Sequence, residues 1–148
     1  MRLVLQRVAQ AAVTVGSEEV ARIGRGLLLL VGVERGDGPP EVEAAVRKVT
    51  ALRIFEDAEG KMNLGPVEAG AEFLVVSQFT LLASTDKGRR PSFERAAAPE
   101  IAAPLVAELA ARLRARGFGV AEGHFGARMR VELVNDGPVT LVLDVLPA

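Results

Sequence analysis

The chain has 148 residues, 49% of them hydrophobic and 25% charged, with a formal net charge of −1. Because it has no cysteine and a single histidine, His124, it excludes disulfides, thiol nucleophiles, Cys₄-type zinc sites and multi-histidine metal sites. No apolar run reaches the roughly 18 residues of a membrane span and no signal-peptide pattern opens the chain, so we expect a cytoplasmic protein with one domain over residues 1–148.

Three strands are predicted in the first third of the chain. The segments 3–8 and 12–15 are rich in β-branched and apolar residues and lead to a turn at Gly16-Ser17. The run 27–33 is short and apolar, which is typical of a buried central strand.

Two helices are predicted in the middle of the chain. After a break at 36–40, apolar residues recur at helical spacing over 42–52. A second helix covers 99–116 and ends at Gly117. Pro104 must lie in the first turn of that helix or kink it.

Further strand patterns lie between and after the helices. Residues 54–55 end a strand before a polar turn, and 73–76 form a buried strand. Alternation over 129–133 predicts another strand, followed by a turn at 135–137 and a final strand over 139–146. The element order predicts a mixed α/β fold, in which a largely antiparallel, barrel-like sheet carries two main helices in a single domain.

The segment 77–81, Ser-Gln-Phe-Thr-Leu, follows the buried strand directly. A strand end holds side chains and backbone N–H groups rigidly, which suits a site that stabilises an oxyanion. The alternative is that Ser77 and Thr80 only cap the strand while Phe79 fills the core. Spacing alone favours this alternative.

The segment 135–140, Asn-Asp-Gly-Pro-Val-Thr, also has two interpretations. Asp-Gly between alternating segments is a strong hairpin signal, so spacing alone predicts a simple turn. Pro138, however, opens the returning strand, and a Gly-Pro bond adopts cis more readily than other peptide bonds. A cis bond would turn both flanking carbonyls in an unusual direction and make a rigid recognition surface without side chains.

Two other features carry candidate functional residues. Lys87, Arg89 and Arg90 form the densest basic cluster, which suits either contact with phosphates or a solvated loop. His124 is the one available imidazole base, and it could form a triad with Ser77 or Thr80 and a carboxylate such as Asp144. A lone histidine in a surface loop is the commoner situation.

Together these stretches resemble the D-aminoacyl-tRNA deacylase family. The matching segments are 5–8, 77–81, 87–93 and 135–140, and the chain length and element order fit as well. The resemblance therefore covers essentially the whole chain. The pair Ser-Gln-x-Thr-Leu and Gly-Pro-Val-Thr is specific in combination, although neither half is specific alone.

The resemblance implies a homodimer that hydrolyses the ester between a D-amino acid and the 3′ adenosine of tRNA, and that also removes mischarged glycine. No cofactor or metal is expected. In the family the Gly-Pro bond is cis and inserts into the active site of the other subunit. Gly137 and Pro138 would then form the chirality filter, with Arg7 holding its orientation and Met129 lining the pocket.

The resemblance further implies that Ser77, Gln78, Phe79 and Thr80 form the catalytic wall around the scissile ester. Thr80 acting as a nucleophile would pass through an acyl-enzyme. In the competing mechanism, the 2′-hydroxyl of the terminal ribose assists a water molecule while backbone N–H groups stabilise the oxyanion. The sequence favours the second mechanism, because neither motif contains a base for Thr80.

Two other classes of function compete with this interpretation. One is a non-catalytic protein that binds RNA or nucleotide ends through the basic cluster and the Gly137-Pro138 turn. The other is a small hydrolase of metabolite esters that depends on His124. Hydrolysis assays with D-Tyr-tRNA, L-Tyr-tRNA and simple esters separate the three.

Overall fold

The computed structural model describes residues 1–146. Its strands are β1 (Arg2–Val15), β2 (Glu18–Ile23), β3 (Gly26–Gly32), β4 (Phe55–Glu56), β5 (Met62–Leu64), β6 (Glu72–Ser77), β7 (Val120–Glu122) and β8 (Met129–Asp144). Its helices are α1 (Pro39–Ala51), the short α2 (Pro66–Ala69) and α3 (Pro99–Ala115), with a 3-10 turn, η1 (Phe79–Leu82). Six strands form the main sheet, while β4 and β5 form a separate hairpin.

β1 is the central strand of the main sheet. It runs antiparallel to β3 over its first half, to β2 over its second half, and to β8 along both halves. β6 and β7 extend the sheet beyond β3 by parallel pairing. The two strands predicted over 3–8 and 12–15 are therefore one continuous strand of 14 residues.

The two predicted helices are confirmed. α1 begins after Gly38, whose N–H donates to Oε2 of Glu41 at 2.7 Å. Of the apolar residues at helical spacing, Val42, Ala45, Val46 and Val49 are buried in α1, while Leu52 caps its end and is half-buried. α3 ends just before Gly117, which has the left-handed φ of +93° expected at a helix stop. Pro104 lies inside α3, past its first turn. No helix within residues 1–146 is long and apolar enough to cross a membrane.

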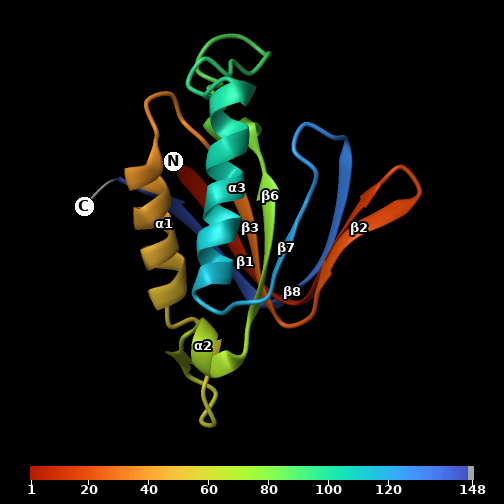
Figure 1. Cartoon of the computed structure of the whole chain (residues 1–148), viewed down its shortest axis with the longest axis vertical. Coiled ribbons are helices and arrows are strands. Elements are labelled where there is room, and N and C mark those ends of the chain that lie inside the picture. The colour runs from red at the N-terminus through yellow and green to blue at the C-terminus, as the bar shows by residue number, and fades with distance from the viewer. Residues whose placement is uncertain (147–148) are drawn as a thin grey trace.

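Two hydrophobic cores lie on opposite faces of the sheet. The larger core packs α1 and α3 against one face, as the layering in Figure 1 shows. The smaller core includes Val8, Ile23 and Leu74, and β2, β7 and part of β8 curl around it on the side away from α1 (Figure 1). This curl gives the sheet its barrel-like form, so the predicted fold class is confirmed.

The hairpin turn expected at 135–137 is wrong. Asn135 pairs with Val8 and Thr140 pairs with Gln6, so both flanks of the segment belong to β8 and run along the same strand, β1. Residues 136–139 lie opposite Arg7 alone and form an excursion within β8, which we call the 136–139 excursion. The Asp-Gly pair thus serves a local bulge, in which Gly137 has a φ of +123°, and the chain does not reverse.

Candidate active site

A cavity of about 510 Å³ opens beside the end of β6 and the start of α3. Ser77, Gln78, Phe79 and Met129 line it, so the structure brings together four of the residues singled out in the sequence. Most of the remaining lining is apolar and comes from α3 and the segments preceding α3 and β8. An apolar cavity with a few polar groups at one wall is the usual form of a small-molecule or cofactor site.

The pairing of β6 with β3 fixes the position of Ser77 and Gln78, the polar wall of the cavity. Ser77, the last residue of β6, pairs with Val31 of β3, and the Gln78 N–H donates to the carbonyl of Val31 at 2.8 Å. The chain then turns into η1, where the Leu81 N–H donates to the carbonyl of Gln78 at 3.2 Å. The backbone carrying the polar groups is thus anchored to a buried strand.

Thr80 lies next to this wall but is not one of the residues that line the cavity. Its side chain is exposed, and its hydroxyl oxygen accepts a hydrogen bond from Nε2 of Gln78. A neutral amide cannot accept the proton of a hydroxyl, so this partner does not activate Thr80 as a nucleophile.

Two aromatic rings stand at the mouth of the cavity. Phe79 is 54% exposed, and its ring meets that of Phe93 edge to face, with centroids 5.0 Å apart. Phe93 also lines the cavity, although sequence patterns assigned it no role beyond membership of the basic segment. Its position just after the basic cluster is the one signal that could have identified it.

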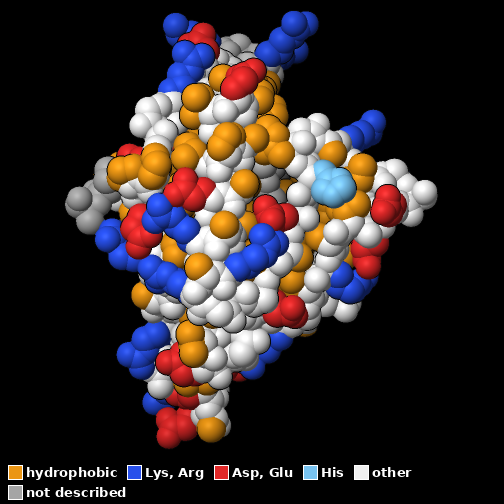
Figure 2. All heavy atoms as spheres, in the orientation of Figure 1, with side chains coloured by type: hydrophobic (Ala, Val, Ile, Leu, Met, Phe, Trp, Pro, Cys, Tyr) orange, Lys and Arg blue, Asp and Glu red, His pale blue; other side chains and the backbone are white. Residues whose placement is uncertain are grey.

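The basic cluster projects from the same end of the molecule. Ser84 and Ser92 exchange two backbone hydrogen bonds of 2.7 and 2.8 Å, which close the loop that contains Lys87, Arg89 and Arg90. All three basic residues are exposed. Figure 2 shows basic side chains projecting at this end, where Figure 1 places the loop that leads into α3.

The structure does not assemble the triad considered for His124. The imidazole lies on the surface (Figure 2), and no hydrogen bond from it is present within residues 1–146. Nδ1 and Nε2 therefore reach neither Ser77 nor a carboxylate. Asp144 lies at the end of β8, where its Oδ1 accepts from Nε of Arg2 at 2.8 Å.

Arg7 binds the 136–139 excursion through its guanidinium. Its side chain is buried, its Nε donates to the Asp136 carbonyl at 3.0 Å, and its Nη1 donates to the Ile54 carbonyl at 2.8 Å. Two carboxylates also lie beside the guanidinium: Oδ2 of Asp136 is 3.6 Å from Nε, and Oε1 of Glu56 is 3.7 Å from Nη2. The contacts with Ile54 and Glu56 could not be predicted from the sequence. The first is made by a backbone carbonyl, and both lie far from Arg7 along the chain.

Asn135 closes the base of the excursion. Its Nδ2 donates to the carbonyls of Arg7 and Val139, each at 3.0 Å. Gly137 and Pro138 are left exposed at the tip, joined by a cis peptide bond. The excursion is therefore a fixed backbone surface that projects from the sheet.

The excursion and the cavity lie far apart within one chain. Arg7 pairs with Leu27 and Leu27 pairs with Phe73, four residues before Ser77. Three strand spacings separate β8 from β6, so the excursion and Ser77 are roughly 20 Å apart at about 4.8 Å per strand and 3.3 Å per residue. Neither Gly137 nor Pro138 lines the cavity of its own chain.

Within residues 1–146, no group of three or more histidine, aspartate or glutamate side chains is arranged to hold a metal ion.

The family model and the sequence relatives indicate one family. The family model described as D-Tyr-tRNA(Tyr) deacylase matches residues 4–144. A D-aminoacyl-tRNA deacylase of Chloroflexus aurantiacus is 60% identical over 97% of this chain and 90% of its own length. A D-aminoacyl-tRNA deacylase of a Roseiflexus species is 58% identical over 97% of this chain and 93% of its own length.

Solved structures share the fold. A structure described as a c-Myc DNA unwinding element binding protein superposes with a TM-score of 0.92 at 41% identity, and each chain is covered completely. A structure described as a probable eukaryotic D-amino acid tRNA deacylase has a TM-score of 0.79 at 22% identity, with 96% of this chain and 97% of that chain covered. With the family match extending over nearly all of the chain, the protein belongs to the D-aminoacyl-tRNA deacylase family, and it is a hydrolase.

Proposed function

We propose that the protein is a cytoplasmic homodimer that hydrolyses the ester bond of D-aminoacyl-tRNA and of mischarged glycyl-tRNA. The observation that carries the proposal is the cavity lined by Ser77, Gln78 and Phe79, with the basic loop at the same end of the molecule. The cavity is large enough for an aminoacylated ribose, and the loop offers cations to phosphates of the acceptor end.

The separation of the two motifs supports a site shared between two subunits. The 136–139 excursion projects from β8 and lies roughly 20 Å from the cavity of its own chain. In a homodimer, the exposed Gly137-Pro138 backbone of one subunit enters the cavity of the other. The free edge of β8, which pairs with β1 alone in the sheet, is available for that approach.

The excursion selects chirality through its backbone. The carbonyls of Gly137 and Pro138 accept hydrogen bonds from the substrate ammonium, and the fixed backbone leaves no volume for an L side chain. A D side chain points out of the pocket, so its chemical identity matters little. Steric exclusion combined with lost hydrogen bonds discriminates strongly, but it cannot reject glycine, which has no side chain to exclude.

Hydrolysis proceeds without a side-chain nucleophile. The 2′-hydroxyl of the terminal ribose assists the attacking water, and backbone N–H groups at Phe79 and Thr80 stabilise the oxyanion. The hydrogen bond from Gln78 to Thr80 fits this assignment, because it offers the Thr80 hydroxyl no base. An activated ester makes positioning and oxyanion stabilisation sufficient for turnover.

The test is hydrolysis of D-Tyr-tRNA, L-Tyr-tRNA and Gly-tRNA by the purified protein. We expect release of D-tyrosine and glycine and retention of L-tyrosine on tRNA. Binding of all three without turnover would contradict the proposal and favour a protein that binds RNA ends. Turnover of simple esters that is lost in His124→Ala would instead favour a metabolite esterase.

The shared site has its own test. Two variants that are inactive on their own, one with the cavity blocked by a bulky residue at Ser77 and the other altered at Gly137, are mixed under conditions that allow subunits to exchange. If each subunit supplies half of a site, the mixed dimer regains one intact site and activity returns. Activity that stays absent despite proven exchange would place both halves of the site in the same chain.

A further inference from the structure

We propose that Arg2 is a positioning residue for the catalytic wall, which it holds in place through the backbone of η1. This inference rests on the proposed function of the 77–80 segment. Arg2 does not touch the cavity, so its effect on the reaction passes through η1.

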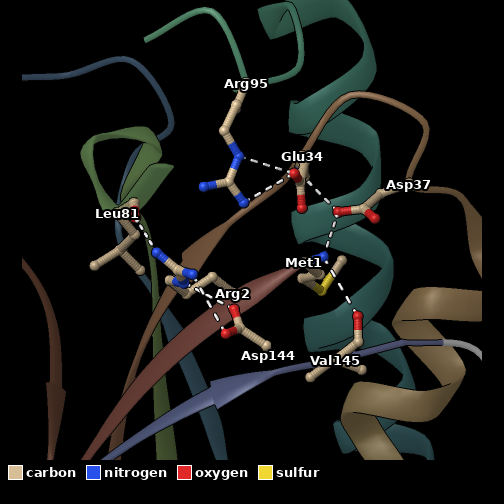
Figure 3. Close-up of polar contacts among 8 residues, drawn as sticks. All are labelled: Met1, Arg2, Glu34, Asp37, Leu81, Arg95, Asp144 and Val145. Atoms are coloured by element: carbon tan, nitrogen blue, oxygen red, sulfur yellow. Dashed lines mark hydrogen bonds and ion pairs between the residues drawn. The ribbon is translucent and has the colours of Figure 1, made fainter. Parts of the chain in front are cut away.

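The guanidinium of Arg2 bridges two elements that lie far apart in the sequence (Figure 3). On one side its Nε and Nη2 donate to the two carboxylate oxygens of Asp144, at 2.8 and 3.3 Å. On the other side its Nη1 donates to the carbonyl of Leu81 at 3.3 Å. Arg2 and Asp144 are directly paired residues of β1 and β8, so the carboxylate orients a guanidinium that reaches η1.

The contact with Leu81 satisfies a carbonyl that η1 itself leaves without a partner. The last carbonyls of a helix have no intrahelical donor, and a cation at that end is favourable. In η1, the Thr80 carbonyl accepts from the Ala83 N–H at 3.1 Å, while the Leu81 carbonyl accepts from Arg2. Since η1 has only four residues, fixing its last turn also fixes the backbone at Phe79 and Thr80.

The backbone of β3 at Gly32 packs closely against η1 and leaves η1 little room to shift. A Cβ added at Gly32 would lie 3.1 Å from Cβ of Leu81 and 3.2 Å from the carbonyl oxygen of Gln78. η1 therefore packs directly against the backbone of β3 at Gly32, where β3 has no side chain. Arg2 supplies the contact from the edge, so η1 is held between β3 and the guanidinium.

The neighbouring charges have partners of their own. Oε1 of Glu34 accepts from Nη2 of Arg95 at 3.0 Å, and Oδ2 of Asp37 lies 2.8 Å from the amino group of Met1 (Figure 3). Asp144 is consequently the one carboxylate bound by Arg2 among residues 1–146. The bridge from Asp144 through Arg2 to Leu81 is thus a defined unit, separable from the ion pairs beside it.

The experiment compares Arg2→Ala with Arg22→Ala. Arg22 is a matched control, because it too is a strand arginine that binds a carboxylate, here Oε1 of Glu19 at 2.6 Å, but it lies away from η1. Single-turnover hydrolysis of D-Tyr-tRNA, KM, Tm and amide hydrogen exchange at η1 are measured for both. Two milder variants, Arg2→Lys and Asp144→Asn, keep the test decisive if Arg2→Ala folds poorly.

We expect Arg2→Ala to lower the rate of hydrolysis roughly 10- to 100-fold, as small displacements of catalytic groups do, while KM and Tm match those of Arg22→Ala. Exchange at the amides of Leu81 and Ala83 should become faster. The hydrolysis rate of Arg2→Lys should lie between those of the wild type and Arg2→Ala, because an ammonium cannot bridge Asp144 and Leu81 as the planar guanidinium does. Asp144→Asn should cost least, because the bond to Leu81 remains.

Unchanged exchange at η1 in Arg2→Ala, or a rate equal to that of Arg22→Ala, would overturn the positioning role. So would an Asp144→Asn rate as low as that of Arg2→Ala with exchange at η1 unchanged from the wild type, since the loss would then not pass through the hydrogen bond to Leu81. A wild-type protein without deacylase activity contradicts the proposed function instead. In that case the exchange comparison alone still decides whether Arg2 holds η1.

Discussion

Arg7 and Gly137 pack so closely that a Cβ added at Gly137 would lie 2.6 Å from Nη2 of the Arg7 side chain. The same Cβ would lie 3.0 Å from Cγ2 of Val139. Because Arg7 is buried and hydrogen-bonded on both sides, it cannot move aside without losing a partner. The guanidinium and a bare α-carbon therefore define the shape of the 136–139 excursion together.

Gly137→Ala should reduce both D-Tyr-tRNA hydrolysis and the preference for the D ester. The new methyl group meets Arg7, and the φ of +123° is one that L residues rarely adopt. Gly16→Ala is the control, because Gly16 also has a positive φ of +62° but its Cβ would meet nothing within 4 Å. Equal selectivity in the two variants would contradict a role of the excursion in chirality. The measurement is the ratio of D to L hydrolysis rates.

Arg7→Ala should destabilise the fold as well as abolish selectivity. The substitution leaves the buried carbonyl of Ile54 and the part-buried carbonyl of Asp136 without their donor, and an unsatisfied buried group costs about 1–3 kcal/mol. Arg53→Ala provides the comparison, since Arg53 also donates to a carbonyl, that of Asn63 at 2.6 Å, but is exposed. Urea unfolding gives the free energies. A loss no greater than that of Arg53→Ala would show that the burial of Arg7 contributes nothing.

Thr80→Val should leave single-turnover hydrolysis of D-Tyr-tRNA close to the wild-type rate. The Thr80 hydroxyl has the Gln78 amide as its partner, while the proposed oxyanion donors are backbone groups that the substitution preserves. If hydrolysis disappears while tRNA binding persists, Thr80 is the nucleophile after all. Trapping an acyl-enzyme in the wild type would give the same answer by an independent route.

Replacing Lys87, Arg89 and Arg90 together with alanine should weaken tRNA binding and flatten its dependence on salt. For a single strand, each phosphate that the protein no longer neutralises reduces the slope of log K against log salt by about 0.7. The three residues are exposed and the loop is closed by Ser84 and Ser92, so the fold should be unaffected. An unchanged slope would remove the loop from the tRNA interface. Binding at several salt concentrations provides the measurement.

The pair Arg2–Asp144 should make stability depend on pH in the acid range. The hydrogen bond from Arg2 holds the pKa of Asp144 below its ordinary value in the folded state. Its contribution is therefore present above the unfolded-state pKa of about 4 and is lost as the pH falls through the lower folded pKa. Because Asp144 is largely exposed, the contribution stays below about 1 kcal/mol.

Asp144→Asn tests this dependence through Tm measured from neutral pH to about pH 2. We expect the wild type to be slightly more stable at neutral pH, and the difference to close on acidification. A difference that widens as the pH falls has the opposite sign. It would mean that Asp144 binds its proton more tightly in the folded protein.

Local patterns in the sequence predicted α1, α3 and the buried strands because each has one hydrophobic period and clear breaks. The nature of the 135–140 segment was not predictable in that way. Asp-Gly serves a hairpin and a bulge equally well, and the choice depends on pairing with the distant strand β1, as the pairing of Asn135 with Val8 shows.

The site, too, was only partly predictable from the sequence. Ser77, Gln78, Phe79 and Met129 meet at one cavity, and three of them are neighbours in the sequence. By contrast, the Ile54 carbonyl that binds Arg7 has no side-chain signature, and nothing local indicates that β4–β5 approaches β1. Interactions made by backbone atoms across long sequence separations were therefore found only in the structure.

The tip of the 136–139 excursion is as exposed as a loop, but both of its ends belong to a paired strand. Residues on both of its sides remain paired with β1, which itself has neighbours on both edges. Opening of the excursion therefore requires β8 to separate from β1 on both sides of it. A substitution away from Arg7 and Gly137 that weakens the sheet is therefore expected to remove activity together with the excursion, and not to leave an active enzyme with a loosened excursion. Loss of stability at such positions should thus lower the rate on D-aminoacyl-tRNA without raising the rate on the L ester.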